Sequence, residues 1–327
     1  MKAWRVNELG EPRDVLRFEE VADLVAGPGQ LLVKVLAAPA NFPDVLLCRG
    51  EYQIKPPLPF TPGVELCGEV LAIGEGVTRF VVGDRVIGNP SLPDGAFAEL
   101  TIMAEADTYS APTSLDDAEA SALSIGYQTS WFALHRRTQL LPGETLLVHA
   151  AAGGVGSTAV QLGKAAGAKV IGVVGGPDKI EYCRALGADL VIDRRSEDFV
   201  SIVNDYTDGR GADVIYDPVG GDAYAKSTKC IAFEGRILTI GFASGTIPTP
   251  GLNHALIKNY SIIGLHWGLY KRYNQQAILD CHDELTRMAD AGLIKPLISE
   301  RLSLADVADG LAKLGEGKSV GRMVFVP

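Results

Sequence analysis

The sequence predicts a two-domain α/β protein, in which a β-rich, barrel-like domain precedes a doubly wound parallel sheet. Three observations support this fold class. Short apolar strands separated by glycine and proline clusters fill the chain up to about residue 122. Strands and helices then alternate as far as about residue 240, as in a parallel sheet with crossover helices. The length of 327 residues suits about two domains.

In the first domain we expect strands at residues 31–38, 68–74 and 84–88. Residues 41–49 are predicted as a short helix. Residues 56–63 contain four prolines and are predicted as a rigid loop. The close spacing of the strands favours a compact, barrel-like domain.

A helix predicted at residues 128–137 opens the second domain. The strands that follow are predicted at residues 145–148, 169–174, 190–192, 213–216 and 236–240. The helices between them are predicted to begin near residues 154, 177, 196 and 222. After a loop, the remaining elements are a helix at 252–258, a strand at 260–265, helices at 275–291 and 304–314, and a strand at 321–327. Right-handed crossovers would place a ligand at the carboxyl ends of the parallel strands.

The composition excludes several classes of function. Apolar residues make up 47% of the chain and charged residues 21%, as in a globular protein with a large core. The net charge of −10 argues against a nucleic-acid partner and against a basic membrane-surface site. No apolar run reaches the roughly 18 residues of a membrane span. The five cysteines are scattered, which fits a reducing cytoplasm, and residues 1–8 lack a signal-peptide core.

Residues 149–156 are the centre of the second domain. A strand-type run precedes them and an alanine-rich, helix-type run follows, so a turn of small residues joins a strand to a helix. Ala151, Gly153 and Gly156 occupy the three glycine positions of the dinucleotide fingerprint. Such a turn lets the backbone approach a pyrophosphate at a helix N-terminus. The predicted contacts are Ala152, Gly153, Gly154, Val155 and Gly156. The alternative is a tight turn that binds nothing.

The end of the next strand favours NADPH over NADH as the cofactor. Folds selective for NAD carry an acidic residue about 20 positions after the glycines. Here Gly175 and Gly176 leave space, Lys179 follows closely, and Arg194 ends the next strand. Space and positive charge suit a 2′-phosphate, so we predict Gly175, Lys179 and Arg194 as contacts. The alternative is that these are ordinary solvated charges, and Asp178 is the residue that would argue for NADH.

Motifs along nearly the whole chain carry a resemblance to a known family. They are Asn-Phe-Pro-Asp at 41–44, Thr-Pro-Gly-Val-Glu at 61–65, Val-Gly-Asp-Arg-Val at 82–86, Tyr-Gln-Thr-Ser at 127–130, the small-residue turn at 151–156, Asp-Pro-Val-Gly-Gly at 217–221 and Gly-Arg-Met-Val at 321–324. The sequence resembles the medium-chain dehydrogenase/reductase superfamily, in its zinc-free NADPH:quinone oxidoreductase and enone reductase branch. The resemblance implies a GroES-like catalytic domain at residues 1–122 and 266–327, and a Rossmann cofactor domain at residues 123–265. It also implies a homodimer paired through the strand at residues 260–265.

The departures from the zinc alcohol dehydrogenases predict that no metal is bound. Those enzymes carry a cysteine near the place of Asn41 and Phe42, and a histidine where this chain has Val64. Valine cannot ligate zinc, and residues 89–98 lack the four cysteines of the structural zinc lobe. A catalytic zinc needs three protein ligands and a structural zinc needs four.

The resemblance implies a small-molecule substrate that accepts hydride without a Lewis acid, namely a quinone or an enone. It implies that the Asn41 amide lies beside the nicotinamide and either donates to a substrate oxygen or orients the ring. It also implies that the Tyr52 phenol donates a hydrogen bond or a proton to the reduced product, and that Thr129 lies beside the nicotinamide. Leu46 stands where relatives often have a second tyrosine. The structural alternatives are local turn bonds for Asn41, packing on the proline loop for Tyr52, and a hydroxyl bonded to its own helix for Thr129.

Further cofactor contacts are implied by the same resemblance. They are Val219, Ile240, Gly241, Phe242, Leu265, Trp267 and Lys318. Two other functions stay open. An enoyl-thioester reductase would need a basic entrance, for which Arg49, Lys55, Lys271 and Arg272 are available. A protein that binds NADPH with little turnover is the other alternative, because a cofactor fold does not prove catalysis.

Overall fold

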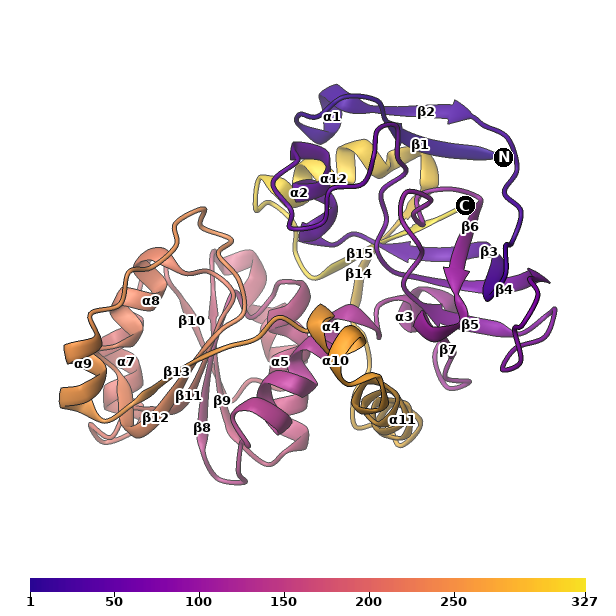
Figure 1. Ribbon diagram of the computed structural model, residues 1–327. Helices are drawn as coiled ribbons and strands as arrows, with labels where there is room; N and C mark the ends of the chain where they lie inside the picture. The colour runs from indigo at the N-terminus through magenta and orange to yellow at the C-terminus, as the bar shows by residue number, and fades with distance from the viewer. The chain divides into compact units, whose positions relative to one another are not determined.

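The computed structural model describes residues 1–327, which form two compact units (Figure 1). Unit 1 comprises residues 1–125 and 286–327, and unit 2 comprises residues 126–285. The second boundary therefore differs from the predicted domain boundary at residue 266. Residues 266–285 belong to unit 2 because Trp267 Nε1 donates to Gln128 Oε1 at 3.1 Å, and because the Tyr270 ring packs on Phe132.

Unit 1 is built around a seven-stranded sheet in the order β14-β15-β3-β4-β5-β7, with β6 paired to β3. These strands are β3 (Gln30–Pro39), β4 (Leu66–Ile73), β5 (Arg85–Gly88), β6 (Leu100–Ala104), β7 (Thr108–Ser110), β14 (Ile298–Ser303) and β15 (Arg322–Val326). A separate hairpin-like pair consists of β1 (Lys2–Val6) and β2 (Leu16–Glu20). The predicted strands at 31–38, 68–74 and 84–88 are confirmed, whereas β1, β2, β6, β7 and β14 were not predicted.

Short helices complete unit 1, and alternation along the strands builds its core. The helices are α1 (Pro12–Val15), α2 (Phe42–Arg49), α3 (Asp117–Ser121) and α12 (Val307–Gly315). On β3, the side chains of Leu31, Val33 and Val35 are fully buried, while Lys34 between them is exposed. Phe325 of β15 meets Phe97 edge to face, with the ring centroids 5.3 Å apart. The last strand of the chain is thus part of the core formed by its first hundred residues.

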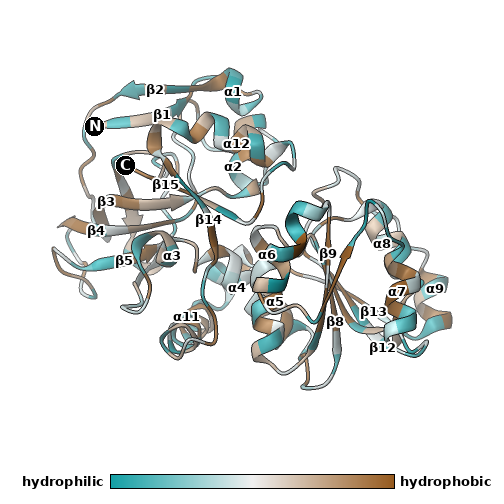
Figure 2. Cartoon of the chain, turned by 180° about the vertical axis from the view of Figure 1, so that it is seen from behind, coloured by the Kyte–Doolittle hydropathy of each residue, from teal (hydrophilic) through white to brown (hydrophobic).

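Unit 2 is a six-stranded parallel sheet in the order β10-β9-β8-β11-β12-β13. The strands are β8 (Thr145–His149), β9 (Lys169–Val174), β10 (Leu190–Asp193), β11 (Ala212–Asp217), β12 (Ile231–Thr239) and β13 (Ser261–Gly264). Numbered within the unit, this order is 3-2-1-4-5-6, so the predicted doubly wound sheet is confirmed. Figure 2 shows apolar strands lying between helices that carry polar residues.

The helices of unit 2 follow the predicted alternation. They are α5 (Gly154–Ala165), α6 (Ile180–Ala185), α7 (Phe199–Tyr206), α8 (Gly221–Ser227), α9 (Leu252–Lys258) and α10 (Gly268–Tyr273). Helix α4 (Ile125–Trp131) begins at the first unit boundary, and the second boundary falls within helix α11 (Gln275–Asp290). No helix combines the length and the apolar character that a membrane crossing requires.

The helix predicted at residues 128–137 has two parts in the structure. Helix α4 ends at Trp131, and residues 132–137 form a π-helical turn. The backbone N–H of Thr138 donates to the carbonyl of Ala133, five residues earlier, and the Thr138 hydroxyl donates to the same carbonyl. Turns of this kind are rare and short, so the helical pattern of the sequence did not reveal it.

Candidate active site

The small-residue turn joins β8 to α5, as predicted. A Cβ atom on Gly156 would lie 2.1 Å from the carbonyl oxygen of Ala150, so only glycine allows the helix to pack this close to the strand end. Gly153 is the N-cap of α5 and offers no side chain to its first-turn N–H groups. These groups therefore fit an anionic ligand such as a pyrophosphate.

His149 is the last residue of β8 and lies directly before this turn. Its ring is buried, with Nε2 2.8 Å from the hydroxyl oxygen of Ser227. Because that hydroxyl donates to the Ala223 carbonyl, Nε2 carries the proton and donates. Burial lowers the pKa of His149 to about 4, and the nearby Arg194 adds to this effect.

Unit 2 therefore loses stability in mild acid. The unfolded chain takes up a proton near pH 6.5, whereas folded His149 resists protonation down to about pH 4. The free energy of unfolding should fall by about 3 kcal/mol from this group between pH 7 and pH 4. A His149→Gln variant, whose amide can also donate to Ser227, should lose this dependence. Urea unfolding at several pH values, with hydrogen exchange reporting unit 2, measures the difference. Parallel pH curves for the two proteins would contradict the prediction.

A group of cations gathers at the carboxyl ends of β9 and β10. The Arg194 guanidinium covers Gly175, since a Cβ on this glycine would lie 3.2 Å from Arg194 Nε. Burial lowers the pKa of Lys179. The charge of Asp178 opposes this shift, and the charges of Arg195 and Arg194 add to it. The Asp193 carboxylate at this edge accepts from the backbone N–H groups of residues 176 and 195, at 2.9 and 3.0 Å. The Asp178 carboxylate also lies at this turn, since a Cβ on Gly176 would lie 2.6 Å from its Oδ1. The cations Lys179 and Arg194 favour a phosphate, whereas Asp178 is the one group here that suits a ribose diol.

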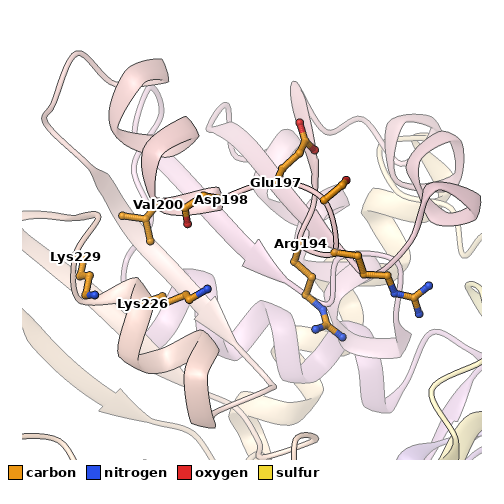
Figure 3. Close-up of a pocket in the computed structure, with 8 residues that line it drawn as sticks. Arg194, Glu197, Asp198, Val200, Lys226 and Lys229 are labelled. Atoms are coloured by element: carbon orange, nitrogen blue, oxygen red, sulfur yellow. The ribbon is translucent and has the colours of Figure 1, made fainter.

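Arg194 also lies on the rim of a pocket of about 520 Å³. Figure 3 shows Arg194 and Lys226 reaching the pocket from the loop after β10 and from α8. Arg195 and Lys229 line it as well, together with Glu197 and Asp198. The Glu197 carboxylate accepts from the backbone N–H of Asp193 at 2.8 Å. The surroundings of Arg194 are therefore positive, although the whole chain carries a net charge of −10.

Two further loops at this edge hold predicted cofactor contacts. The Asp217 carboxylate accepts from the backbone N–H groups of Val219 and Gly220, at 2.8 and 2.9 Å, and shapes the loop after β11. The N–H of Ile240 donates to the Asp217 carbonyl, so the segment containing Ile240, Gly241 and Phe242 lies beside that loop. The Leu265 N–H donates to the Thr239 carbonyl at 3.2 Å. The structure therefore brings Val219 close to the segment at 240–242, with Leu265 at the end of the neighbouring strand.

The remaining residues predicted for the site differ in their surroundings. Trp267 is held by Gln128, and the Lys271 ammonium lies 5.2 Å from the centroid of its ring. Thr129 is half-buried on α4, and its hydroxyl has no hydrogen-bond partner in the chain. Lys318 lies in unit 1, where it is exposed and pairs with Glu316 at 2.6 Å. Its predicted cofactor contact remains a prediction.

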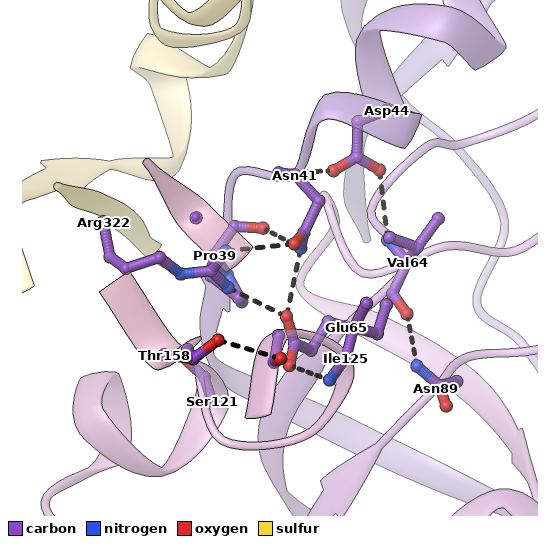
Figure 4. A network of polar contacts seen from close by, with 12 residues as sticks. Pro39, Asn41, Asp44, Val64, Glu65, Asn89, Ser121, Ile125, Thr158 and Arg322 are labelled. Atoms are coloured by element: carbon purple, nitrogen blue, oxygen red, sulfur yellow. Dashed lines mark hydrogen bonds and ion pairs between the residues drawn. The ribbon is translucent and has the colours of Figure 1, made fainter. Parts of the chain in front are cut away.

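In unit 1, Asn41 belongs to a buried polar cluster with Glu65 and Arg322 (Figure 4). Arg322 donates from Nη2 to Glu65 Oε2 at 3.0 Å and from Nη1 to Asn41 Oδ1 at 3.1 Å. Asn41 Nδ2 donates to Glu65 Oε2 and to the Pro39 carbonyl, at 3.1 and 3.2 Å. Both amide hydrogens are therefore used within the unit. The prediction that this amide donates to a substrate oxygen does not fit the structure, because a side chain with no free N–H cannot do so.

Asp44 fixes the backbone of Asn41. It is fully buried and accepts from the backbone N–H groups of Asn41, Gly63 and Val64, at 2.9, 2.9 and 3.1 Å. Burial raises the pKa of Asp44 to about 7, against the lowering effect of these three donors. The carboxylate thus ties the first turn of α2 to the loop at residues 63–64.

Tyr52 follows the end of α2 and packs partly against the core of unit 1. Burial raises the pKa of its phenol above the usual value of 10, and the charge of Asp44 adds to this effect. The phenol therefore stays protonated at neutral pH, and its hydroxyl donates to no group of the chain. A proton donor needs both properties.

Comparison with known proteins identifies the chain. The profile described as "Alcohol dehydrogenase GroES-like domain" matches residues 27–113, and "Zinc-binding dehydrogenase" matches residues 154–281. The chain is 38% identical over 326 residues to quinone oxidoreductase-like protein 2 homolog of Nematostella vectensis, with 99% of this chain and 88% of that protein covered. A quinone oxidoreductase of Pseudomonas aeruginosa is 34% identical over 316 residues, with 96% of each covered.

The chain belongs to the quinone oxidoreductase family.

The fold agrees with this assignment. The structure matches that of Escherichia coli quinone oxidoreductase complexed with NADPH with a TM-score of 0.92, 28% identity and complete coverage of both chains. The predicted resemblance to the medium-chain dehydrogenase/reductase superfamily is confirmed, as is the GroES-like fold of the first domain.

Although one matching profile is described as zinc-binding, the residues of this family member do not offer a set of zinc ligands. Glu65 already accepts from Asn41, Arg322 and the backbone N–H of Ile125. The Cys48 and Cys67 thiols are buried, and the Cys67 Sγ lies 3.9 Å from Asp117 Oδ1. No group of three or more histidine, cysteine or acidic side chains is arranged to hold a metal.

The sequence analysis did not single out Arg322 and Gln128, two residues whose side chains hydrogen-bond to predicted site residues. Arg322 was noted only as part of a motif, yet it is 4% exposed and pairs with two members of the cluster. The signal was an arginine between Gly321 and the apolar run 323–326, where a strand of this kind is buried. Gln128 gave no comparable signal, because only the fold places it beside Trp267.

Proposed function

We propose that this family member is an NADPH-dependent oxidoreductase that transfers hydride to a quinone or an α,β-unsaturated carbonyl compound. The observation that carries the proposal is the Arg194 guanidinium beside Gly175 and the Arg195 guanidinium beside Gly176, with Lys179 close enough to feel both charges. A phosphate on the adenosine ribose is the anion such a group selects. The names of the relatives, and the NADPH in the Escherichia coli complex, support the same function.

Each unit supplies a different part of the chemistry. NADPH supplies the hydride when bound. In unit 2, the first turn of α5 would hold the pyrophosphate, the cation group would hold the 2′-phosphate, and Thr129 would donate to the nicotinamide or the acceptor. In unit 1, Tyr52 would protonate the reduced product. We assign Asn41 a positioning role, since the Arg322 and Glu65 contacts fix its amide.

Replacing Tyr52 by phenylalanine should lower kcat/KM for an enone at least 10-fold, because the reduced product loses its proton donor. The wild-type rate should also fall at alkaline pH, above the usual tyrosine pKa of 10, as the phenol ionises. The affinity for NADPH should not change. Steady-state kinetics from pH 6 to pH 11 test this. An unchanged rate and pH profile would assign Tyr52 to packing alone.

The function is tested by following NADPH oxidation with a quinone, a short enone and a short enoyl-thioester, each with NADH in parallel. We expect turnover with the quinone or the enone, and activity that survives extended treatment with EDTA, since we propose that no metal takes part. Activity that is lost in EDTA and restored by zinc would contradict the metal-free proposal. A preference for the thioester would move the protein to the enoyl reductases, and NADPH binding without any oxidation would favour a non-catalytic role.

Three of the four charges suggested for a thioester entrance contact other side chains, and Lys55 is the one that is exposed without such a contact. Arg49 pairs with Glu11 at 2.9 Å, and Arg272 lies 5.2 Å from the centroid of the Tyr273 ring. Lys271 lies over Trp267. The quinone or enone is therefore the substrate class that we favour.

We propose that the chain forms a homodimer through the edge of the sheet of unit 2. The strand β13 pairs only with β12, which leaves its other edge open. Large exposed apolar side chains occur on β13 and on the segments before it, namely Ile262 on β13, Leu252, Leu256 and Ile257 on α9, Phe233 on β12 and Ile247 in the loop before α9. Monomers rarely leave an open edge and an apolar patch side by side.

Light scattering of the purified protein should give about twice the chain mass of 34.7 kDa. Changing Ile262 and Leu256 to aspartate should yield a monomer that keeps its circular dichroism spectrum. The matched control is Leu293→Asp, an exposed leucine of unit 1, and this variant should stay dimeric. A monomeric wild type, or a dimer that survives the double change, would refute this interface.

We also propose a cytoplasmic location and no nucleic-acid partner. All five cysteines are free and buried, as in proteins of a reducing compartment. The acidic balance of the chain opposes binding to a polyanion. Fractionation of the native cells and a filter-binding assay with RNA at physiological salt test the two statements.

A further inference from the structure

Three buried hydroxyl groups meet beneath the small-residue turn of unit 2. Ser130 Oγ of α4 lies 2.7 Å from Thr158 Oγ1 of α5 and 2.9 Å from the phenol oxygen of Tyr216 on β11. The first two side chains are 0% and 2% exposed, and Tyr216 is 0% exposed. Polar groups buried this deeply are stable only when their hydrogen bonds are made, so the geometry of this hydroxyl cluster is tightly defined.

The protons of the hydroxyl cluster can be assigned. The Tyr216 hydroxyl has one hydrogen-bond partner, Ser130 Oγ, while Ser130 has other acceptors, so we infer that Tyr216 is the donor of this pair. Ser130 in turn donates to Thr158 Oγ1 or to the carbonyl of Val155 at 3.1 Å. Thr158 donates to the carbonyl of Val155 at 2.8 Å or of Gly126 at 3.0 Å. Each proton has an acceptor, and the chain of donors ends on the backbone of α5 and α4.

Each member of the hydroxyl cluster belongs to a segment that carries proposed cofactor contacts. Ser130 follows Thr129 on α4. Thr158 and the Val155 carbonyl lie in the first turns of α5, whose N–H groups fit a pyrophosphate. Tyr216 precedes Asp217, whose carboxylate holds the backbone of Val219 and Gly220. Ser130 is therefore part of the first segment, α4, and its Oγ forms hydrogen bonds with Thr158 of the second segment and with Tyr216, which directly precedes the third.

We propose that Ser130, Thr158 and Tyr216 are positioning residues that hold these three segments in register for the dinucleotide. They act through the backbone and touch neither the cofactor nor the substrate. The inference rests on the proposed function, because it assigns a role toward NADPH. It predicts that the cluster sets the affinity for NADPH and leaves the chemical step nearly unchanged, since small displacements of binding groups lower affinity strongly.

The test compares Ser130→Ala, Tyr216→Phe and the double variant with the wild type. Isothermal titration with NADPH should show a dissociation constant about 10-fold higher for Ser130→Ala, which leaves the Tyr216 hydroxyl buried without a partner. The double variant should bind no worse than Ser130→Ala, because it removes that unpaired hydroxyl. At saturating NADPH, kcat should stay within about twofold. Hydrogen exchange of the free protein should be faster for the amides of residues 154–158 and 219–221.

The matched control is Thr207→Val, which removes a buried hydroxyl near the amino-terminal end of β11, whereas the cofactor contacts are proposed at the carboxyl ends of the strands. Thr207 Oγ1 donates to the Val203 carbonyl at 2.7 Å and accepts from the N–H of Gly211, which directly precedes β11. This variant should lower the melting temperature without changing NADPH affinity or exchange at residues 154–158. The inference is overturned if the Ser130 and Tyr216 variants match the control in affinity and exchange. A wild type that binds no NADPH would refute the proposed function, and the exchange data would still decide the positioning role.

Discussion

Replacing Arg322 by methionine should lower the free energy of unfolding of unit 1 by about 3–5 kcal/mol, the usual cost of leaving a buried charge unpaired. Glu65 is fully buried and would lose its charged partner, while Asn41 Oδ1 would lose a donor. Burial already raises the pKa of Glu65, and the Arg322 charge is the main force that opposes this. Urea unfolding, followed by hydrogen exchange at β3 and β4, measures the loss.

Two further variants test whether the stability lost in Arg322→Met comes from the buried Glu65–Arg322 pair and not from removing a charge in general. Lys313→Met removes an ion pair with Glu300 that is partly exposed, and it should cost less than about 1 kcal/mol. The double variant Glu65→Gln with Arg322→Met should recover part of the lost stability, because it no longer buries a lone carboxylate. A loss below about 1 kcal/mol for Arg322→Met would show that Glu65 is stabilised without the arginine.

Changing both Lys179 and Arg194 to alanine should raise KM for NADPH about 100-fold or more and leave KM for NADH within about threefold. Each charge-assisted hydrogen bond to a phosphate contributes roughly 1.5–3 kcal/mol, and two are removed. The Gly175 backbone would remain in place, because the Arg194 side chain only covers it. Kinetics at constant acceptor concentration with both cofactors give the ratio directly.

Lys229→Ala is the matched control for this change. Lys229 lines the same pocket as Arg194 but does not contact Gly175, so its loss should raise KM for NADPH by less than about threefold. The NADPH preference of the wild type should also weaken as salt is added, because exposed charges are screened. If the double variant weakens both cofactors equally, or the wild type binds NADH as tightly as NADPH, then these cations do not select the 2′-phosphate.

Most of the fold could be predicted from local patterns. The alternation of strand and helix between residues 145 and 240 is strong because each parallel strand is an apolar run bounded by turns. The glycine requirement at position 156 was also visible, and the structure explains it by a backbone contact of 2.1 Å with Ala150. The strand β14 was missed because its sequence, Ile-Ser-Glu-Arg-Leu-Ser, carries little apolar signal, and pairing with β15 decides its structure.

The sequence by itself determined the family, the doubly wound sheet, the small-residue turn and the cations after β9 and β10, because these depend on residues that are near one another in the chain. Only the tertiary structure decided which hydrogen-bond partner each buried polar group has. Asn41, Glu65 and Arg322 are separated by up to 281 residues, yet their hydrogen bonds leave the Asn41 amide no free N–H. Ser130 likewise meets Tyr216 across 86 residues. Hydrogen-bond partners of buried groups come from the packing of distant segments, so no local pattern can assign them.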